Sequence, residues 1–145
     1  MLSCVVLMAR ARAAWYEWYP DYAYDFSGIS FSSGDSVRVT VTAASTKSGT
    51  AKIENLTTGK TVTESITSSS ALCEQDAEWI VEDYEENGGL VPFANFGTVT
   101  FTSASAGKSS GSSGPSGATI IDIEQNGNVL TSVSTSSSSV TVKYV

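Results

Sequence analysis

Three features of the 145-residue sequence predict an all-β fold, an antiparallel β-sandwich. Short segments rich in Val, Thr and aromatic residues alternate apolar and polar positions, as strands with one buried face do. No segment shows the period of an amphipathic helix, and no segment repeats. Turn-forming pairs such as Gly34-Asp35 and Asn126-Gly127 separate the segments. Nine or ten short antiparallel strands joined in this way favour two packed sheets.

The first predicted element is an aromatic-rich strand pair over residues 14–26, which turns at Pro20-Asp21. Alternation places Trp15, Glu17 and Tyr19 on one face of the first strand. Aromatic stripes in strands are usually core, and that reading applies here too. An unpaired carboxylate is costly on a buried face, so Glu17 between two aromatic residues favours the wall of a binding cleft instead.

The next segments alternate cleanly around turns. Residues 36–43 are predicted to direct Val37, Val39 and Val41 inward, and a polar loop over 44–49 follows. The other segments on the N-terminal side are a hairpin of 50–56 with 60–66 around Thr57-Thr58-Gly59, and a flexible loop over 65–71 that leads to Cys73. Asn55-Leu56-Thr57 is an N-glycosylation sequon, which has meaning only in a secreted chain.

Residues 73–102 place aromatic residues and carboxylates among β-forming residues. A strand over 77–84 would put Glu78, Ile80, Glu82 and Tyr84 on one face and Trp79, Val81 and Asp83 on the other. The turn over 85–89 contains Asn-Gly and Gly-Gly, which supply positive φ at low cost. Extended structure over 90–96 and a strand over 97–102, with Val99 and Phe101 on one face, complete this stretch. A strand–turn–strand unit that carries Glu82 among apolar residues is the candidate site of chemistry.

The C-terminal third is predicted to hold one loop and three strands. Residues 103–117 are rich in Ser and Gly and predict a surface loop. The Asn126-Gly127 pair is the strongest hairpin signal in the chain, between strands over 119–124 and 128–133. Residues 139–145 alternate Val140, Val142 and Tyr144 and are expected to close the sheet.

Charge and composition exclude several classes of function. The chain has 8 Lys and Arg against 15 Asp and Glu, a net charge of −7, which argues against nucleic acid or an anionic membrane as partner. It contains no His, so His-based triads and His–metal sites are excluded. Two cysteines, Cys4 and Cys73, make a Cys metal site improbable, and we expect no metal and no cofactor. No apolar run approaches the roughly 18–20 residues that span a bilayer.

Several segments together resemble the eqolisins, a family of fungal glutamic endopeptidases. The segments are AEWIVEDYEE followed by PFANFGTVTF, and AWYEWYPDYAYDFS, GDSVRVTV, AKIENLTTGKTVT, IIDIEQNGNVLT and VTVKYV. They follow the family's order and cover nearly all of residues 14–145, which we take as one domain of this kind. Residues 1–13 do not match, have the charge order of a poor secretory signal, and are expected to replace the family's first strands.

The resemblance implies an acid endopeptidase whose sandwich consists of two large antiparallel sheets, similar to a concanavalin-like fold. It gives Glu82 the role of general base and places Trp15, Glu17 and Tyr19 along the substrate cleft. The substrate would be protein or peptide, and the chain an extracellular monomer. A carboxylate can take a proton from water and return it to the leaving amine, and carboxyl groups titrate in the acid range.

The catalytic partner of the family's Glu is a Gln in an Ile-Leu-Gln-Thr-Gly segment, which has no counterpart in these 145 residues. Gln75 in a loop and Gln125 beside a hairpin turn do not look like substitutes. The Cys that pairs with the family's equivalent of Cys73 also has no counterpart. The alternative prediction is therefore a catalytically inactive relative, or a module that binds peptide or polysaccharide.

A glycosidase is a further alternative, tested on Glu78 and Glu82. Four residues along a strand separate their Cα atoms by about 13 Å. Retaining glycosidases need carboxyl groups about 5–5.5 Å apart and inverting ones about 6.5–9.5 Å. The geometry is poor for this class, although a neighbouring strand could supply another acid.

Overall fold

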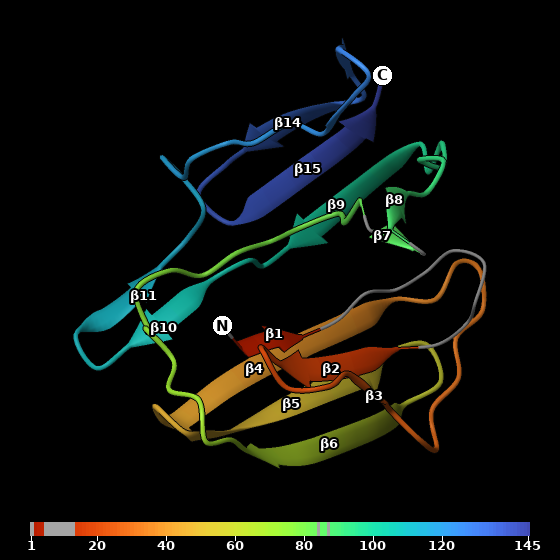
Figure 1. Ribbon diagram of the computed structural model, residues 1–145. Helices are drawn as coiled ribbons and strands as arrows, with labels where there is room; N and C mark the ends of the chain where they lie inside the picture. The colour runs from red at the N-terminus through yellow and green to blue at the C-terminus, as the bar shows by residue number, and fades with distance from the viewer. Residues whose placement is uncertain (1, 5–13, 84, 87) are drawn as a thin grey trace. The chain divides into compact units, whose positions relative to one another are not determined.

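The computed structural model describes residues 2–4, 14–83, 85–86 and 88–145. Within these residues the chain has no helix, and every strand pairing is antiparallel (Figure 1). The predicted all-β antiparallel class is confirmed. The expectations for residues 5–13, Tyr84 and Asn87 lie outside the described residues.

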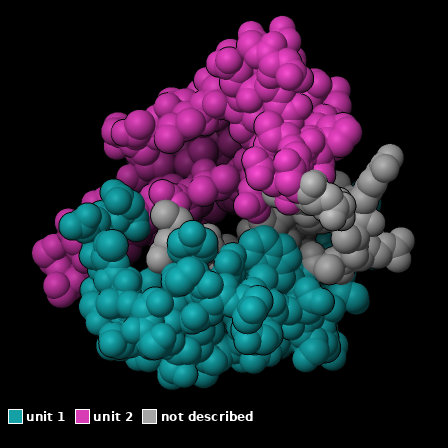
Figure 2. Space-filling view, viewed as in Figure 1, with its two compact units in different colours: residues 1–76 teal, residues 77–145 magenta. Residues whose placement is uncertain are grey.

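The described chain divides into two compact units, residues 1–76 and 77–145, which are coloured separately in Figure 2. The first unit holds two three-stranded sheets, in the orders β1-β2-β3 and β4-β5-β6. The strands are β1 (Leu2–Cys4), β2 (Trp15–Trp18), β3 (Tyr24–Asp25), β4 (Val37–Ser45), β5 (Ser48–Asn55) and β6 (Lys60–Thr67).

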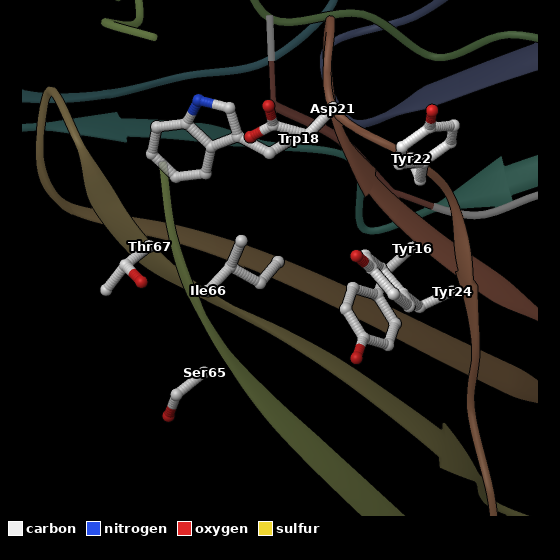
Figure 3. A pocket seen from close by; sticks show the side chains of 8 residues that line it. All are labelled: Tyr16, Trp18, Asp21, Tyr22, Tyr24, Ser65, Ile66 and Thr67. Atoms are coloured by element: carbon white, nitrogen blue, oxygen red, sulfur yellow. The ribbon is translucent and has the colours of Figure 1, made fainter. Parts of the chain in front are cut away.

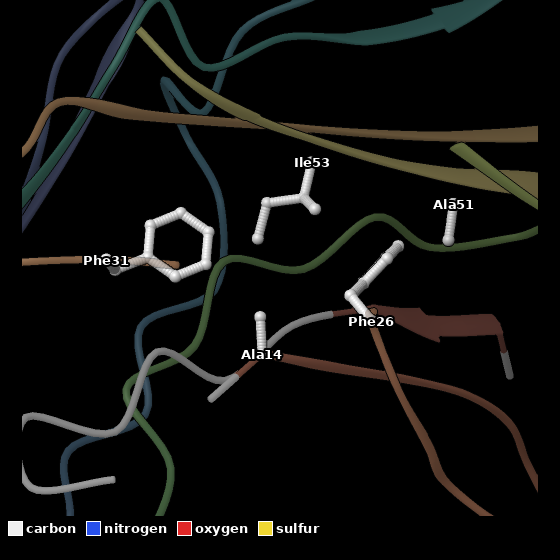
Figure 4. Close-up of a cluster of buried hydrophobic side chains, with 5 residues drawn as sticks. All are labelled: Ala14, Phe26, Phe31, Ala51 and Ile53. Carbon is white, nitrogen blue, oxygen red and sulfur yellow. The ribbon is translucent and has the colours of Figure 1, made fainter. Parts of the chain in front are cut away.

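Buried apolar side chains join the two sheets of the first unit. Figure 4 shows the cluster, formed by Ala14, Phe26, Phe31, Ala51 and Ile53. Ala14 and Phe26 flank β2 and β3, whereas Ala51 and Ile53 belong to β5, so each sheet contributes one side of the core. This two-layer packing is the sandwich that the alternating pattern predicted.

The predicted inward direction of β4 is half right. Val39 and Val41 lie opposite Ile53 and Ala51 in the strand register, so they do share the core face of the sheet. They are nevertheless 38% and 41% exposed. Alternation specifies the face of the sheet on which a side chain lies. Because β4 is an edge strand, the burial of Val39 and Val41 depends on what covers that part of the face.

Two loop predictions in the first unit are only partly correct. The polar loop over 44–49 is mostly strand, because β4 runs to Ser45 and β5 begins at Ser48. The predicted flexible loop over 65–71 begins inside β6, and only residues 68–71 lie outside the strand. Hydrogen bonds from Ser68 N to Lys47 O, and from Leu72 N, just after the loop, to Thr46 O hold its two ends. Ser and Thr are common in loops, but both also fit strands, and composition did not separate the two cases.

The predicted hairpins of the first unit are confirmed. β5 pairs with β6 from Ser48↔Thr67 to Asn55↔Lys60, and Gly59 takes φ +76° in the connecting turn. β2 pairs with β3 through Trp15↔Asp25 and Tyr16↔Tyr24, on either side of Pro20.

The second unit contains one three-stranded sheet, in the order β14-β15-β9, and three small hairpins. Its strands are β7 (Glu85–Glu86), β8 (Gly89–Leu90), β9 (Thr98–Thr102), β10 (Ala106–Lys108), β11 (Gly111–Ser113), β12 (Glu124–Gln125), β13 (Asn128–Val129), β14 (Thr131–Thr135) and β15 (Ser139–Tyr144). β9 and β15 carry the predicted alternation, with Val140 and Val142 buried. β15 is the central strand and does not close the sheet as predicted.

Three predictions in the second unit need correction. Residues 103–117 contain the β10–β11 hairpin and are not a plain loop. The predicted strand over 119–124 is reduced to Glu124, and Ile121 is 83% exposed. Residues 77–83 and 91–96 have no ladder partner among the described residues. A strand needs a neighbour to bond with, and an alternating sequence does not specify one.

Candidate active site

Glu82 lies in the unpaired segment over residues 77–83, directly before the β7–β8 hairpin. Exposure alternates along this segment as the sequence predicted: Trp79, Val81 and Asp83 are half-buried, whereas Glu78, Ile80 and Glu82 are exposed. The predicted faces are therefore correct, although the predicted hydrogen-bonded strand is absent. No described residue makes an ion pair or hydrogen bond with the Glu82 carboxylate.

Asp83 is held by Gln125, a residue that the sequence did not single out as functional. The Gln125 side-chain Nε2 lies 3.1 Å from Asp83 Oδ1, 3.0 Å from Asp83 Oδ2 and 3.2 Å from the Val91 carbonyl oxygen. Asp83 and Val91 bracket the β7–β8 hairpin, whose register pairs Glu85 with Leu90 and Glu86 with Gly89. The Asn-Gly turn marked the position of Gln125 in a hairpin, but no sequence signal connected it with a residue 42 positions away.

Aromatic side chains lie close together just beyond this hairpin. Phe93 contacts Phe96 edge-on at a centroid distance of 5.7 Å and stacks on Tyr144 at 6.1 Å. Tyr144 belongs to β15, so the segment after β8 is anchored to the three-stranded sheet.

Trp15, Glu17 and Tyr19, the predicted cleft residues, come from β2 and the residue after it. Trp15 and Glu17 are half-buried, and Tyr19 is 62% exposed. The structure thus brings Trp15 and Glu17 together on one strand of the first unit, two residues apart. Glu82 belongs to the second unit, and each unit is described by itself.

A pocket of about 350 Å³ lies on the opposite face of β2 (Figure 3). Its lining residues are Tyr16, Trp18, Asp21, Tyr22, Tyr24, Ser65, Ile66 and Thr67. Trp18 is 1% exposed, and its indole N–H donates to the Ser70 carbonyl at 2.9 Å. The Ser68 hydroxyl donates to Asp21 Oδ2 at 2.5 Å. These bonds fix the Trp18 and Asp21 walls of the pocket.

The Tyr16 ring forms a third wall of this pocket and stacks on Tyr24 at a centroid distance of 5.9 Å. Burial raises the pKa of Tyr16 above its ordinary value of 10.0, and the nearby charges of Glu64 and Tyr24 raise it further. Four of the residues that line the pocket are aromatic, and none is Lys or Arg. The sequence placed Tyr16 and Trp18 on one face but did not indicate a pocket there.

The acidic and thiol groups of the described residues are dispersed. No group of three or more Cys, Asp or Glu among these residues is arranged to hold a metal ion. Cys73 is exposed and forms no disulfide with any described residue. The described part of the chain also contains no helix long and apolar enough to cross a membrane.

Comparison with known proteins gives a family match over almost the whole chain. The model of the Peptidase A4 family matches residues 9–144. Aspergillopepsin-2 from Aspergillus niger is 59% identical over 134 residues, which are 91% of this chain and 48% of that protein. Scytalidopepsin B from Scytalidium lignicola is 45% identical over 141 residues, 91% of this chain and 54% of that protein. The chain spans about half the length of these relatives.

Solved structures agree with this match. This chain superimposes on the crystal structure of aspergilloglutamic peptidase from Aspergillus niger with a TM-score of 0.86 and 58% sequence identity. The match covers 92% of this chain and 79% of the other chain. Scytalido-glutamic peptidase with a transition-state analogue inhibitor gives a TM-score of 0.85 at 43% identity, over 92% of this chain and 69% of that one.

Proposed function

Because this chain belongs to the Peptidase A4 family, the eqolisins, we propose that it is a glutamic-type acid endopeptidase in which Glu82 is the general base. The observation that supports this role most directly is the exposed, unpaired carboxylate of Glu82 within the segment that resembles the family's catalytic motif. A base must reach water and substrate, and a carboxylate tied into an ion pair would be less available for proton transfer.

The proposed chemistry assigns one step to each described group. Glu82 takes a proton from the attacking water and returns it to the leaving amine. Trp15, Glu17 and Tyr19 bind and orient the peptide along β2. The amide that donates to the developing oxyanion in this family lies in a segment without a counterpart in these 145 residues.

The proposed substrate is protein or peptide, and the proposed setting is extracellular, in a fungal-type secreted monomer. The net charge of −7 argues against nucleic acid or anionic lipid as a partner.

The test compares Glu82→Gln with Glu78→Gln in cleavage of a denatured protein at acid pH. Both residues are exposed and lie on the same face of the segment, so the control removes one charge nearby without touching the base. Glu82→Gln should lower kcat by about 10²–10⁴-fold, the usual contribution of a general base. Equal activity of the two variants would refute the role of Glu82.

The second candidate is a catalytically inactive relative that binds peptide or polysaccharide. The tyrosine-lined pocket on β2 favours it, because aromatic rings with a few polar groups are typical of ligand sites. Two results together would support this candidate. The wild-type protein would show no acid peptidase activity, and it would still bind oligosaccharides or peptides with a change in Trp18 fluorescence. Activity that depends on Glu82 would reject it.

A further inference from the structure

We propose that Gln125 is a positioning residue that fixes the backbone of the segment carrying Glu82. This inference rests on the proposed role of Glu82 as base. Gln125 itself would touch no substrate and would act through Asp83, the neighbour of Glu82 in the chain.

The contacts of Gln125 use all the donor capacity of its side-chain amide. An amide NH₂ group has two hydrogens. The Gln125 Nε2 atom lies 3.1 and 3.0 Å from the two oxygens of Asp83 and 3.2 Å from the Val91 carbonyl oxygen, so one hydrogen serves the carboxylate and the other serves the carbonyl. One side chain therefore ties together the two chain segments that enter and leave the β7–β8 hairpin.

The β12–β13 hairpin that carries Gln125 is fixed by its turn geometry and by several hydrogen bonds. It is the last residue of β12 before Asn126 and Gly127, which both have positive φ, +52° and +79°, and it pairs with Asn128 across the turn. The base of the same hairpin is closed by a bond from Leu130 N to Ile123 O at 2.8 Å. The buried Thr131 hydroxyl accepts from Ile123 N at 2.8 Å and donates to Asp122 Oδ1 at 3.1 Å.

Without the hydrogen bonds from Gln125 to Asp83 and Val91, few contacts would hold the segment around Glu82. Residues 77–83 form no ladder with any described strand, and β7–β8 has two residue pairs, too few for an independently stable hairpin. Because adjacent side chains of an extended segment point to opposite sides, fixing half-buried Asp83 also fixes the direction in which exposed Glu82 points. Misplacing a catalytic group by about 1 Å can cost about 10²-fold in rate.

The test uses Gln125→Leu, which keeps similar bulk without the donors, and Gln75→Leu as the same change at an exposed position. The first readout is the backbone ¹H–¹⁵N NOE, with the amides of β9, β14 and β15 as an internal measure of folding. In Gln125→Leu the NOE should fall at Glu82 and Asp83 and stay unchanged in the sheet. An unchanged NOE at Glu82 would overturn the proposal.

Enzyme kinetics separate a positioning role from a structural one. Gln125→Leu should lower kcat at least about tenfold with KM changed less than about twofold, whereas Gln75→Leu should match wild type. A lowered NOE with unchanged kcat would refute positioning. If the wild type shows no peptidase activity, the proposed function fails, and the NOE comparison still decides whether Gln125 fixes Glu82.

Gln125→Glu provides a rescue that depends on pH. Among the described residues, Asp83 is the titratable group in contact with this side chain. Glu82 directly precedes Asp83 in the chain, and Glu124 directly precedes position 125. A protonated carboxyl at position 125 can donate to Asp83, whereas two carboxylates repel. The NOE at Glu82 should therefore be close to the wild-type value at acid pH and should decrease as the pH rises toward 7. An NOE that does not change with pH would contradict the proposed role of the hydrogen bond between residue 125 and Asp83.

Discussion

Asn55 and Asp35 share a hydrogen bond of 2.7 Å between Asn55 Nδ2 and Asp35 Oδ2, and the Asn55 side chain is completely buried. The same amide donates to the Ser30 carbonyl, and its oxygen accepts from the backbone N–H groups of Thr57 and Thr58. One side chain thus joins the Gly34-Asp35 turn to the β5–β6 hairpin turn.

Replacing Asn55 by Ala should destabilise the protein by roughly 2–4 kcal/mol, because four hydrogen bonds are lost and their partners remain partly buried. Urea unfolding measures the change. Asn128→Ala is the control, since Asn128 is exposed and its side chain makes one local bond. A loss no larger than that of the control would contradict the predicted role of Asn55.

The sequon at Asn55 should carry no glycan in the folded protein. Asn55 is 0% exposed, its side-chain nitrogen donates two hydrogen bonds, and Thr57 Oγ1 accepts from Ser36 N at 2.9 Å. Intact mass before and after N-glycosidase treatment of natively folded, secreted material tests this. A glycan at Asn55 in protein of normal stability would show that the described packing is incorrect.

Tyr16 should make stability depend on pH in the alkaline range. Burial, then Glu64 and Tyr24, raise its pKa in the folded state above 10.0, so the folded state favours the neutral phenol. This contribution is complete below pH 10 and is lost as pH rises through the higher folded pKa. Tyr16→Phe should flatten the stability profile above pH 10, measured by urea unfolding together with tyrosinate absorbance. An unchanged profile would contradict it.

Gly114 should not tolerate a side chain. A Cβ atom there would overlap the carbonyl oxygen of Ser137, a backbone atom that cannot turn away. Gly114→Ala should cost about 2 kcal/mol or more by forcing the backbone to shift. Gly107→Ala is a matched control, since no atom lies within 4 Å of the point that its Cβ would occupy and its φ is not positive. Equal melting temperatures of the two variants would exclude this close approach.

Tyr19→Ala should weaken substrate binding if the exposed ring lines the cleft. KM for a peptide substrate is expected to rise about tenfold, as stacking and burial of one aromatic ring are lost. Tyr22→Ala in the same β2–β3 connection removes a ring that is even more exposed, 84% against 62%, from the separate pocket and should leave KM unchanged. A larger rise in KM for Tyr22→Ala would move the binding surface to that pocket.

Local sequence determined what depends on neighbouring residues along the chain. The turns at Gly59 and Asn126-Gly127, the paired β5 and β6, and the alternation of exposure over residues 77–83 all follow from side-chain period and backbone preference. The family motifs likewise identified the fold class, because they are strings of adjacent residues.

The tertiary structure decided what depends on segments far apart in the chain. It left Val39 and Val41 on the core face yet exposed, buried the Asn55 sequon, and gave residues 77–83 no ladder partner among the described residues. It also brought Gln125 to Asp83 across 42 residues. Burial and hydrogen-bond partners are set by which elements meet in space, and a one-dimensional pattern fixes the face of a strand without fixing what covers it.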